Sequence, residues 1–307
     1  MTWQEYAQNL AASGLKPPEI NFLERVFNFT KKIHEGERRL SGEPFFDHPV
    51  AVSLQLLKLN LGTASVAAGL LHDAAERDST ALKTIRKDFG EEVAFLVDGV
   101  TKVDKVEARG AERALESMRK MFLAVAEDIR VVIIKLADRL HNMETLWALP
   151  EAKQERIARE TLNLYAPLAE RLGMWNFKAQ LEDFAFQYLW PGEYKEISSE
   201  IRKRAPERER HLKKIVSVVE AELAKDGIKS KDIHYRAKHI YSAWQKLQRY
   251  QGDWFHLSDL VAVRIIVRDI KDCYAALGTI HKLWKPVPGR FHDYIALPKP
   301  NGYQSLH

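Results

Sequence analysis

The sequence has little cysteine and no long apolar stretch. Cys273 is the single cysteine among 307 residues, which excludes an intramolecular disulfide framework and a multi-cysteine zinc site. The apolar run that follows it favours a packed thiol over a catalytic one. No window approaches the roughly 20 consecutive apolar residues that span a bilayer, and the N-terminal MTWQEYAQNL lacks the basic and apolar segments of a signal peptide. We therefore expect a cytoplasmic protein with no membrane partner.

The chain also has little excess charge. A net charge of +5 and a pI near 9.0 favour anionic partners, but the excess is small for a dedicated nucleic-acid binder. Glu residues interrupt the basic run RKRAPERERHLKK, as is typical of a solvated helix face. We expect a phosphate-rich small molecule as the partner and no direct nucleic-acid binding. Nothing in the sequence predicts an oligomeric state.

Helical periodicity dominates residues 19–225, and the pattern then changes. The runs DIHYRAK, LVAVRIIV and DYIAL predict short strands, separated by helices over 239–250 and 271–284. We predict a helical domain over 1–151, a helical connector over 152–225 and a mixed α/β domain over 226–307. Within the connector, Pro167 and Pro206 predict a kink or a restart.

Four residues of the helical part form a candidate metal site. His72 and Asp73 are adjacent in LLHDAAERDST, His48 stands just ahead of a helix that Pro49 can open, and Asp138 lies in KLADRLHNMETL. A mixed nitrogen and oxygen set suits a transition metal such as Mn or Fe better than the oxygen-only sites of Mg or Ca. A lone His-Asp pair is most often a cap or a surface pair, so the prediction depends on all four residues together.

The same region offers groups for substrate. The segment 128–149 predicts one helix, ended by Pro150, on which Asp138, Asn142 and Thr145 share a face. Glu76 follows His72 by four residues, which predicts the same face and a role in activating or orienting a water molecule. Basic side chains in HEGERRLSGEP, Arg38 and Arg39 among them, can hold phosphate or a purine ring.

The α/β part carries a second set of polar residues. The candidates for nucleotide binding and for a Mg²⁺ site are Arg236, Lys238, Ser242, Lys246, Asp259, Lys299, Asn301 and Tyr303. The first four enter a predicted helix, whose N-terminal N–H groups and cationic side chains suit a triphosphate. Asp259, before a strand, is a candidate Mg²⁺ ligand, and Tyr303 is an aromatic platform for a base. Taken separately, loop lysines and tyrosines are usually just exposed.

Together these motifs resemble a known family. HEGERRLSGEPFFDHPVAV, LLHDAAERD, LVDGVTKVDK and DIRVVIIKLADRLHNMETL are similar to the hydrolase domain of long RelA/SpoT-type alarmone enzymes, and the similarity continues through ETLNLYAPLAERLG to the end. The resemblance implies an all-α HD-superfamily hydrolase domain followed by an α/β, nucleotidyltransferase-like synthetase domain that is incomplete at its C-terminus. It also implies removal of the 3′-pyrophosphate from ppGpp and pppGpp with Mn²⁺.

The resemblance gives each candidate a role. It implies Mn²⁺ ligation by His48, His72, Asp73 and Asp138, nucleotide contacts by Arg39, Asn142 and Thr145, and Glu76 as the first acid of an HDxxED motif. The synthetase transfers pyrophosphate from ATP to GDP or GTP, which implies an ATP side at Arg236, Lys238, Ser242 and Lys246, Mg²⁺ at Asp259 and guanine stacking on Tyr303. The family tetrad RxKD appears as Arg290 to Asp293 with His292 in place of Lys. Because the family's second acidic residue lies beyond His307, we expect the chain to bind guanine nucleotide but to make little alarmone.

Two departures from the family pattern leave alternatives open. Arg77 replaces the second acid of HDxxED, and Leu40 replaces a basic residue beside Arg39. Asp78 could substitute for the missing acid, although a shift of one residue turns a side chain by about 100° around a helix. Glu76 alone could suffice and give a slower hydrolase. The domain could instead be degenerate and bind alarmone as a regulatory module, or hydrolyse other nucleotides.

Overall fold

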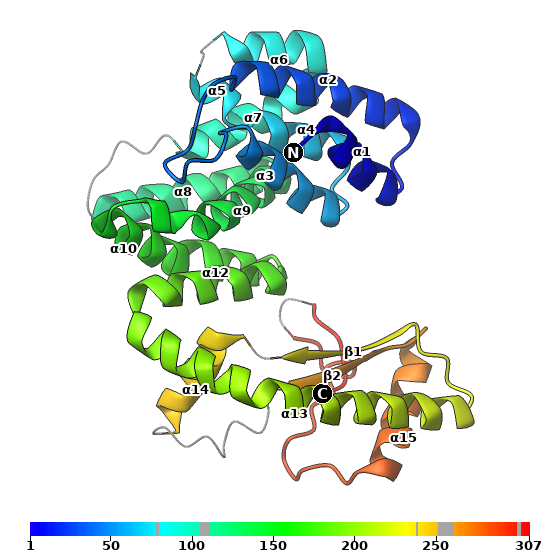
Figure 1. Cartoon of the computed structure of the whole chain (residues 1–307). Helices are drawn as coiled ribbons and strands as arrows, with labels where there is room; N and C mark the ends of the chain where they lie inside the picture. Colours follow the sequence, from blue (N-terminus) through cyan, green and yellow to red (C-terminus); the bar gives the residue numbers. More distant parts are fainter. Residues whose placement is uncertain (78–79, 105–110, 238, 251–260, 300–301) are drawn as a thin grey trace. The chain divides into compact units, whose positions relative to one another are not determined.

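The computed structural model divides into two compact units, Met1–Pro191 and Gly192–His307 (Figure 1). It describes residues 1–77, 80–104, 111–237, 239–250, 261–299 and 302–307, some of them by their backbone alone. Within these ranges, no helix is both long enough and apolar enough to pass through a membrane.

The first unit is helical throughout. Its elements are α1 (Trp3–Ala12), α2 (Pro17–Ile33), α3 (Asp47–Lys58), α4 (Thr63–Leu71), α5 (Ala74–Arg77), α6 (Ala81–Phe89), α7 (Glu91–Asp104), α8 (Ala111–Glu127), α9 (Ile129–Glu144), the 3₁₀ turn η1 (Leu146–Ala148), α10 (Glu151–Glu160), the π-helical turn η2 (Thr161–Tyr165), α11 (Ala166–Arg171) and α12 (Trp175–Leu189).

Helix α9 lies at the centre of this unit, in contact with α3, α4, α7, α8 and α12. Val132, Ile134, Leu136 and Leu140 are fully buried, so α9 is apolar around most of its circumference, as expected for a core helix. Asp138 is buried among them. A carboxylate in such surroundings is costly unless other groups compensate its charge, so its partners define the site.

Gly69 allows α3 and α4 to pack closely. A Cβ atom there would lie 2.5 Å from Leu56 Cδ1 and 3.3 Å from the Cα of Ser53. The absent side chain therefore lets the backbones of the two helices approach each other. This approach brings His48, near the start of α3, close to His72, at the end of α4.

Helices beyond residue 151 share the same core. Tyr165, Leu168, Leu181 and Ala185, from η2, α11 and α12, are buried in one cluster with the side chains of α9. The predicted restart at Pro167 is confirmed, because α11 begins at Ala166 with this proline in its first turn. The π-helical turn η2 lies directly before α11, so the transition from α10 to α11 takes place in this turn.

The second unit combines helices with a two-stranded sheet. Its elements are α13 (Pro191–Lys225), β1 (Asp232–Ala237), α14 (Ile240–Arg249), β2 (Val261–Ile266) and α15 (Ile270–Leu283). The strands are antiparallel, with Asp232 opposite Ile266 and Ala237 opposite Val261. Val219, Leu223 and Ala276 form a small core between α13 and α15. The mixed α/β prediction and the two helices over 239–250 and 271–284 are confirmed.

One local prediction in this unit is wrong. Residues 293–297 form a turn, because the Asp293 carboxylate accepts hydrogen bonds from the N–H groups of Ile295 and Ala296 at 2.9 and 2.8 Å. Asp293 alone pairs with Leu306, in an isolated bridge. At Pro206 the chain does not restart, because α13 is one helix from Pro191 to Lys225, so only a kink is compatible with the structure there.

Candidate metal centre and adjoining pocket

The structure brings the four predicted metal ligands together from three segments. His48 comes from α3, His72 and Asp73 from the junction of α4 and α5, and Asp138 from α9. Asp138 Oδ1 lies 3.2 Å from His48 Nε2 and 3.7 Å from His72 Nε2. The carboxylate of Asp73 lies 3.6 and 3.3 Å from the same two nitrogens. His48, His72 and Asp138 are buried, so the cluster is largely shielded from solvent.

These spacings fit a cation. The two Nε2 atoms of His48 and His72 lie 3.2 Å apart, so every close pair in the cluster is separated by 3.2 to 3.7 Å. A metal with bonds of about 2.0–2.2 Å to nitrogen and oxygen holds neighbouring ligand atoms about 3.0–3.5 Å apart. The donors are imidazole nitrogens and carboxylate oxygens, and they converge on one position. The described residues can therefore hold a metal ion here.

Backbone geometry corrects three details of the sequence prediction. His48 lies in the first turn of α3, where Pro49 is tolerated because its missing N–H would have no intrahelical acceptor. His72 caps α4, so the His-Asp pair lies between two helices, and Glu76 belongs to α5 and not to the helix that His72 ends. The side chain of Glu76 lies outside the described residues, as does that of Arg77.

Hydrogen bonds behind the two histidines point their Nε2 lone pairs toward the cluster. His72 Nδ1 lies 2.8 Å from the carbonyl oxygen of Gly69, which can only accept, so Nδ1 carries the proton. His48 Nδ1 lies 2.8 Å from Nδ1 of His141. Such contacts fix the tautomer and the orientation of a ligating imidazole.

Asp138 is held from two sides. Lys135 Nζ donates to Oδ2 at 2.5 Å, and Asn142 Nδ2 donates to Oδ1 at 2.5 Å. Burial by itself would raise the pKa of Asp138, but the Lys135 ammonium and the rings of His48 and His72 hold this pKa well below its ordinary value. The carboxylate therefore stays ionised, as a metal ligand must.

The histidines respond differently to their surroundings. Burial lowers the pKa of His48. Burial also opposes protonation of His72, but the Asp73 and Asp138 carboxylates outweigh it and raise the pKa of His72 to about 9. In the metal-free protein the cluster therefore retains a proton, and a metal ion would displace it. Burial, with His48 and Arg39 nearby, lowers the pKa of His141 to about 4.

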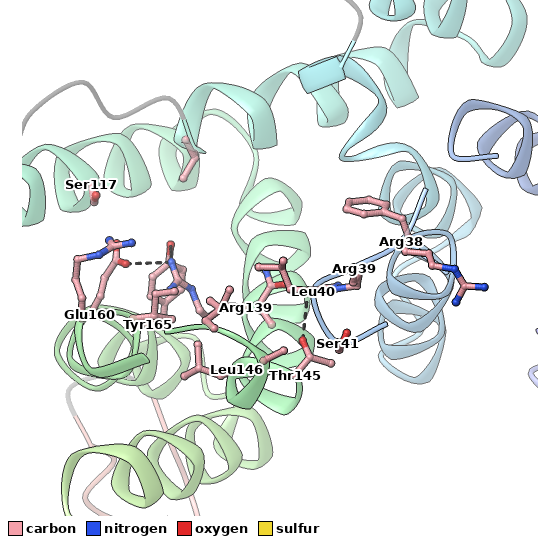
Figure 2. A pocket seen from close by; sticks show the side chains of 17 residues that line it. Arg38, Arg39, Leu40, Ser41, Ser117, Arg139, Thr145, Leu146, Glu160 and Tyr165 are labelled. Carbon is pink, nitrogen blue, oxygen red and sulfur yellow. Dashed lines mark hydrogen bonds and ion pairs between the residues drawn. The ribbon is translucent and has the colours of Figure 1, made fainter. Parts of the chain in front are cut away.

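The three predicted substrate contacts also lie together, next to the metal cluster. Arg39 Nη2 donates to Asn142 Oδ1 at 2.7 Å and to Thr145 Oγ1 at 3.3 Å (Figure 2). Asn142 is on α9 and Thr145 caps its end, because α9 stops at Glu144, earlier than predicted. The Asn142 amide therefore connects Arg39 to Asp138, since it accepts from one and donates to the other.

A cavity of about 470 Å³ opens beside this group. It is lined by Arg38, Arg39, Leu40, Ser41, Phe45, Val103, Ser117, Arg139, Asn142, Thr145, Leu146, Ala148, Leu149, Arg156, Ile157, Glu160 and Tyr165. Within it, Arg139 donates to Tyr165 Oη at 2.8 Å and to Glu160 at 3.3 Å. Figure 2 shows Leu40 beside Arg39 at the wall of this cavity, and 76% of Leu40 is exposed.

The predicted nucleotide residues of the second unit are less completely defined. Lys238, Asp259 and Asn301 lie outside the described residues, as does the side chain of Arg236. Ser242 Oγ lies 2.6 Å from His239 Nε2, and Lys246 Nζ lies 5.9 Å from the centre of the Tyr250 ring. Lys299 Nζ is 5.5 Å from the Tyr303 ring centre, and Tyr303 Oη is 2.9 Å from His307 Nε2. Of the predicted set, the structure thus shows Lys299 and Tyr303 together.

Sequence reasoning missed several side chains that support the metal cluster and the cavity. Lys135 and His141 each lie three residues from Asp138 on α9, a spacing that could have indicated them. Arg139 on α9 and Tyr165 at the end of the π-helical turn η2 lie 26 positions apart, with η1 and α10 between them. Their 4.0 Å cation–π contact could not have been read from the sequence.

Comparison with known proteins agrees with this architecture. Residues 27–175 match the family described as "HD domain", and residues 235–307 match the family described as "Region found in RelA / SpoT proteins". The chain is therefore an HD-domain protein with a second, distinct domain. The two matches in this order show that it belongs to the RelA/SpoT-type proteins, as the sequence motifs predicted.

Curated relatives are named as a pyrophosphokinase or as a pyrophosphohydrolase. The chain is 49% identical over 285 residues to a GTP pyrophosphokinase of Streptomyces coelicolor, covering 93% of this chain and 33% of the relative. It is 45% identical over 292 residues to the guanosine-3′,5′-bis(diphosphate) 3′-pyrophosphohydrolase of Aquifex aeolicus, with 95% and 42% covered.

A third relative is named for both activities. Identity is 42% over 304 residues to the bifunctional (p)ppGpp synthase/hydrolase SpoT of Escherichia coli K12, with 99% of this chain and 43% of the relative covered. The chain therefore spans less than half the length of these relatives.

Proposed function

We propose that the first unit hydrolyses guanosine 3′,5′-bis(diphosphate), ppGpp or pppGpp, at its 3′-pyrophosphate with the help of Mn²⁺. The observation that carries this proposal is the buried cluster of His48, His72, Asp73 and Asp138, whose ligand atoms lie 3.2 to 3.7 Å apart. Imidazole and carboxylate ligands together favour Mn²⁺ or Fe²⁺ over Mg²⁺. The pyrophosphohydrolase name of a relative supports the choice of substrate.

A divalent cation bound in this cluster would polarise a phosphoryl oxygen and lower the pKa of a nearby water molecule. The protein's own residues would do the rest. Arg39, Asn142 and Thr145 line the cavity next to the cluster, where a guanidinium, an amide and a hydroxyl can orient a nucleotide. Glu76 keeps its predicted role as the group that orients the water and accepts its proton.

The cavity suits a nucleotide in size and charge. Its volume of about 470 Å³ lies within the range of small-molecule sites, about 300–1,000 Å³. Arg139 and Arg156 also line it and would attract phosphate groups of the substrate. Leu40 offers an apolar surface where the family pattern has a basic side chain.

For the second unit we propose a part in pyrophosphate transfer from ATP to GDP or GTP, with Mg²⁺, in a chain that carries the whole synthetase domain. The names of the relatives and the RelA/SpoT match support this proposal. The roles are those predicted from the sequence. Arg236, Lys238, Ser242 and Lys246 would bind ATP, Asp259 would bind Mg²⁺, and Lys299, Asn301 and Tyr303 would contact the guanine nucleotide.

One sequence feature favours a second candidate function. Arg77 stands where the HDxxED motif has its second acid, and a guanidinium does not accept a proton at neutral pH. A domain that binds alarmone without hydrolysing it would retain the metal ligands and the pocket but not the turnover. An HD phosphohydrolase that acts on other nucleotides would also retain them.

One assay separates these candidates. The purified chain is incubated with ppGpp and Mn²⁺, and the release of GDP and pyrophosphate is followed by chromatography. The proposal expects turnover that stops with EDTA and returns when Mn²⁺ is restored. The matched variants are His72→Ala, which removes a ligand, and His211→Ala, which removes an exposed histidine on α13.

Binding of ppGpp without product would favour the regulatory module. A competition experiment with GDP, which lacks the 3′-pyrophosphate, is run on the wild-type and His72→Ala proteins. Nucleotide binding that does not depend on the 3′-pyrophosphate would favour a different nucleotide substrate. Equal turnover by the two histidine variants would exclude the cluster as the reaction centre.

A further inference from the structure

His141 lies between a metal ligand and the arginine that faces the cavity. Its Nδ1 is 2.8 Å from Nδ1 of His48 and 3.4 Å from Nη1 of Arg39. The rings of His48 and His141 are 4.8 Å apart, centre to centre, and tilted by 51°. None of the expected site residues included His141, and the proposed chemistry does not use it.

The contacts around it fix the position of each proton. Two Nδ1 atoms at 2.8 Å share one hydrogen, so one ring donates and the other accepts. His48 directs Nε2 at Asp138 Oδ1 and at His72 Nε2, both 3.2 Å away, where its lone pair is needed for a metal. The hydrogen of His48 therefore resides on Nδ1, and His141 Nδ1 accepts it.

Arg39 supports the same arrangement. A guanidinium has only donors, so its approach to His141 Nδ1 also requires an acceptor there. His141 is consequently the tautomer with its proton on Nε2. The two histidine ligands thus obtain their orientation in different ways: His72 from a backbone carbonyl, that of Gly69, and His48 from a side chain.

We propose that His141 is a positioning residue for the metal site. It accepts the Nδ1 hydrogen of His48, keeps the His48 Nε2 lone pair directed at the cluster, and so increases the affinity of the site for a divalent cation. The inference rests on the proposed function only in taking the cluster as a metal site. It assigns His141 no contact with substrate.

The test measures metal affinity with no nucleotide present. Apo wild-type protein and three variants are titrated with Mn²⁺ by calorimetry. His141→Leu keeps roughly the volume of the side chain but has no hydrogen-bond acceptor, and His141→Ala removes both the volume and the acceptor. His141→Asn places an amide oxygen, which is an acceptor, near the former Nδ1. Loss of an outer hydrogen bond to a metal ligand typically costs about 10–100-fold in affinity. We expect this loss in the Leu and Ala variants and a clearly smaller one in the Asn variant.

Thermal melting of each metal-free variant shows whether its fold is retained, and the Ala and Asn pair decides the matter if the Leu variant does not fold. Wild-type affinity in the folded Ala variant would overturn the proposal. An Asn variant as weak as the Ala variant would also overturn it, because the acceptor would then not be what His141 supplies. If the wild-type chain binds Mn²⁺ but leaves ppGpp intact, the proposed function fails while this inference is still decided by the affinities.

Discussion

The two units of the molecule present their polar residues in opposite ways. The first unit buries His48, His72 and Asp138 inside an apolar helical core. In the second, Lys299 is exposed and Tyr303 is partly exposed, on a segment without regular secondary structure. Burying charge is costly unless other groups compensate it, so a buried polar cluster indicates a ligand far more strongly than an exposed one. The cluster in the first unit is therefore the stronger structural indication of a site.

The largest expected effect is the loss of metal from the first unit. His72→Ala removes one of four converging ligands, so the purified variant should contain no stoichiometric divalent metal by elemental analysis. The exposed His211→Ala variant should retain it. Stoichiometric metal in His72→Ala would remove the contrast between the units and exclude the assignment of this cluster.

The next effect concerns Arg77. An acid at this position should improve water activation, and a positioned acid or base is worth about 10²–10⁴ in rate. We expect Arg77→Asp to raise kcat for ppGpp hydrolysis by more than about tenfold, measured at saturating substrate. Arg77→Gln is the control for charge removal alone. An unchanged kcat in Arg77→Asp would mean that Glu76 or Asp78 already does this work.

The second unit should be sensitive at Tyr303. Stacking of a base on an aromatic ring contributes about 1–3 kcal/mol, so Tyr303→Ala should weaken GDP binding by about 5–150-fold in titration calorimetry. Tyr303→Phe keeps the ring and should lose much less, although it also loses the contact to His307. The titration uses the His72→Ala background to suppress the first site. Equal affinities would show that Tyr303 is an ordinary surface residue.

Metal affinity should depend on pH in one direction. Below its pKa of about 9, which Asp73 and Asp138 raise against the effect of burial, His72 carries a proton that a metal must displace. Mn²⁺ affinity should therefore fall as the pH drops below that value, by up to about tenfold per pH unit for one proton. Calorimetry in buffers of different ionisation enthalpy counts the protons released. A flat profile would mean that the metal-free cluster is already deprotonated.

The smallest effect is on stability. The carboxylate of Asp128 caps α9 by accepting from the backbone N–H of Arg130 at 2.9 Å, and ion-pairs with the Arg130 side chain at 2.7 Å. Asp128→Ala should cost about 1 kcal/mol in the free energy of unfolding, and Asp128→Asn less, since Asn also caps helices. Chemical denaturation measures both.

The pH dependence of this pair has a definite sign. The Arg130 guanidinium holds the pKa of Asp128 below its ordinary value in the folded state. Its ionic contribution to stability is therefore present above the unfolded pKa and is lost as the pH falls through the folded pKa. The difference between wild type and Asp128→Asn should vanish in acid. A difference that persists there would assign the effect to the cap alone.

Much of this architecture could be predicted from the sequence, and particular residues show where prediction stops. The periodicity around Asp138 placed it with Asn142 and Thr145, because helical spacing is local. Strands β1 and β2 were visible as β-rich runs for the same reason. The turn at Asp293 was missed because a side chain there satisfies two backbone N–H groups, which a hydrophobic pattern does not reveal. His141 was missed because its role depends on His48, 93 residues away in the chain.

Gly69 has a consequence for how this site can change. Its missing side chain sets the distance between two helices, and its carbonyl sets the orientation of His72. Both features belong to the backbone, so exchanging one ligand type for another, as in engineering a new metal preference, would leave them in place. A larger residue at position 69 would alter helix spacing and ligand orientation together. A metal preference of this cluster would thus depend partly on helix packing, and a redesign of the site would have to begin with a residue that is not itself a ligand.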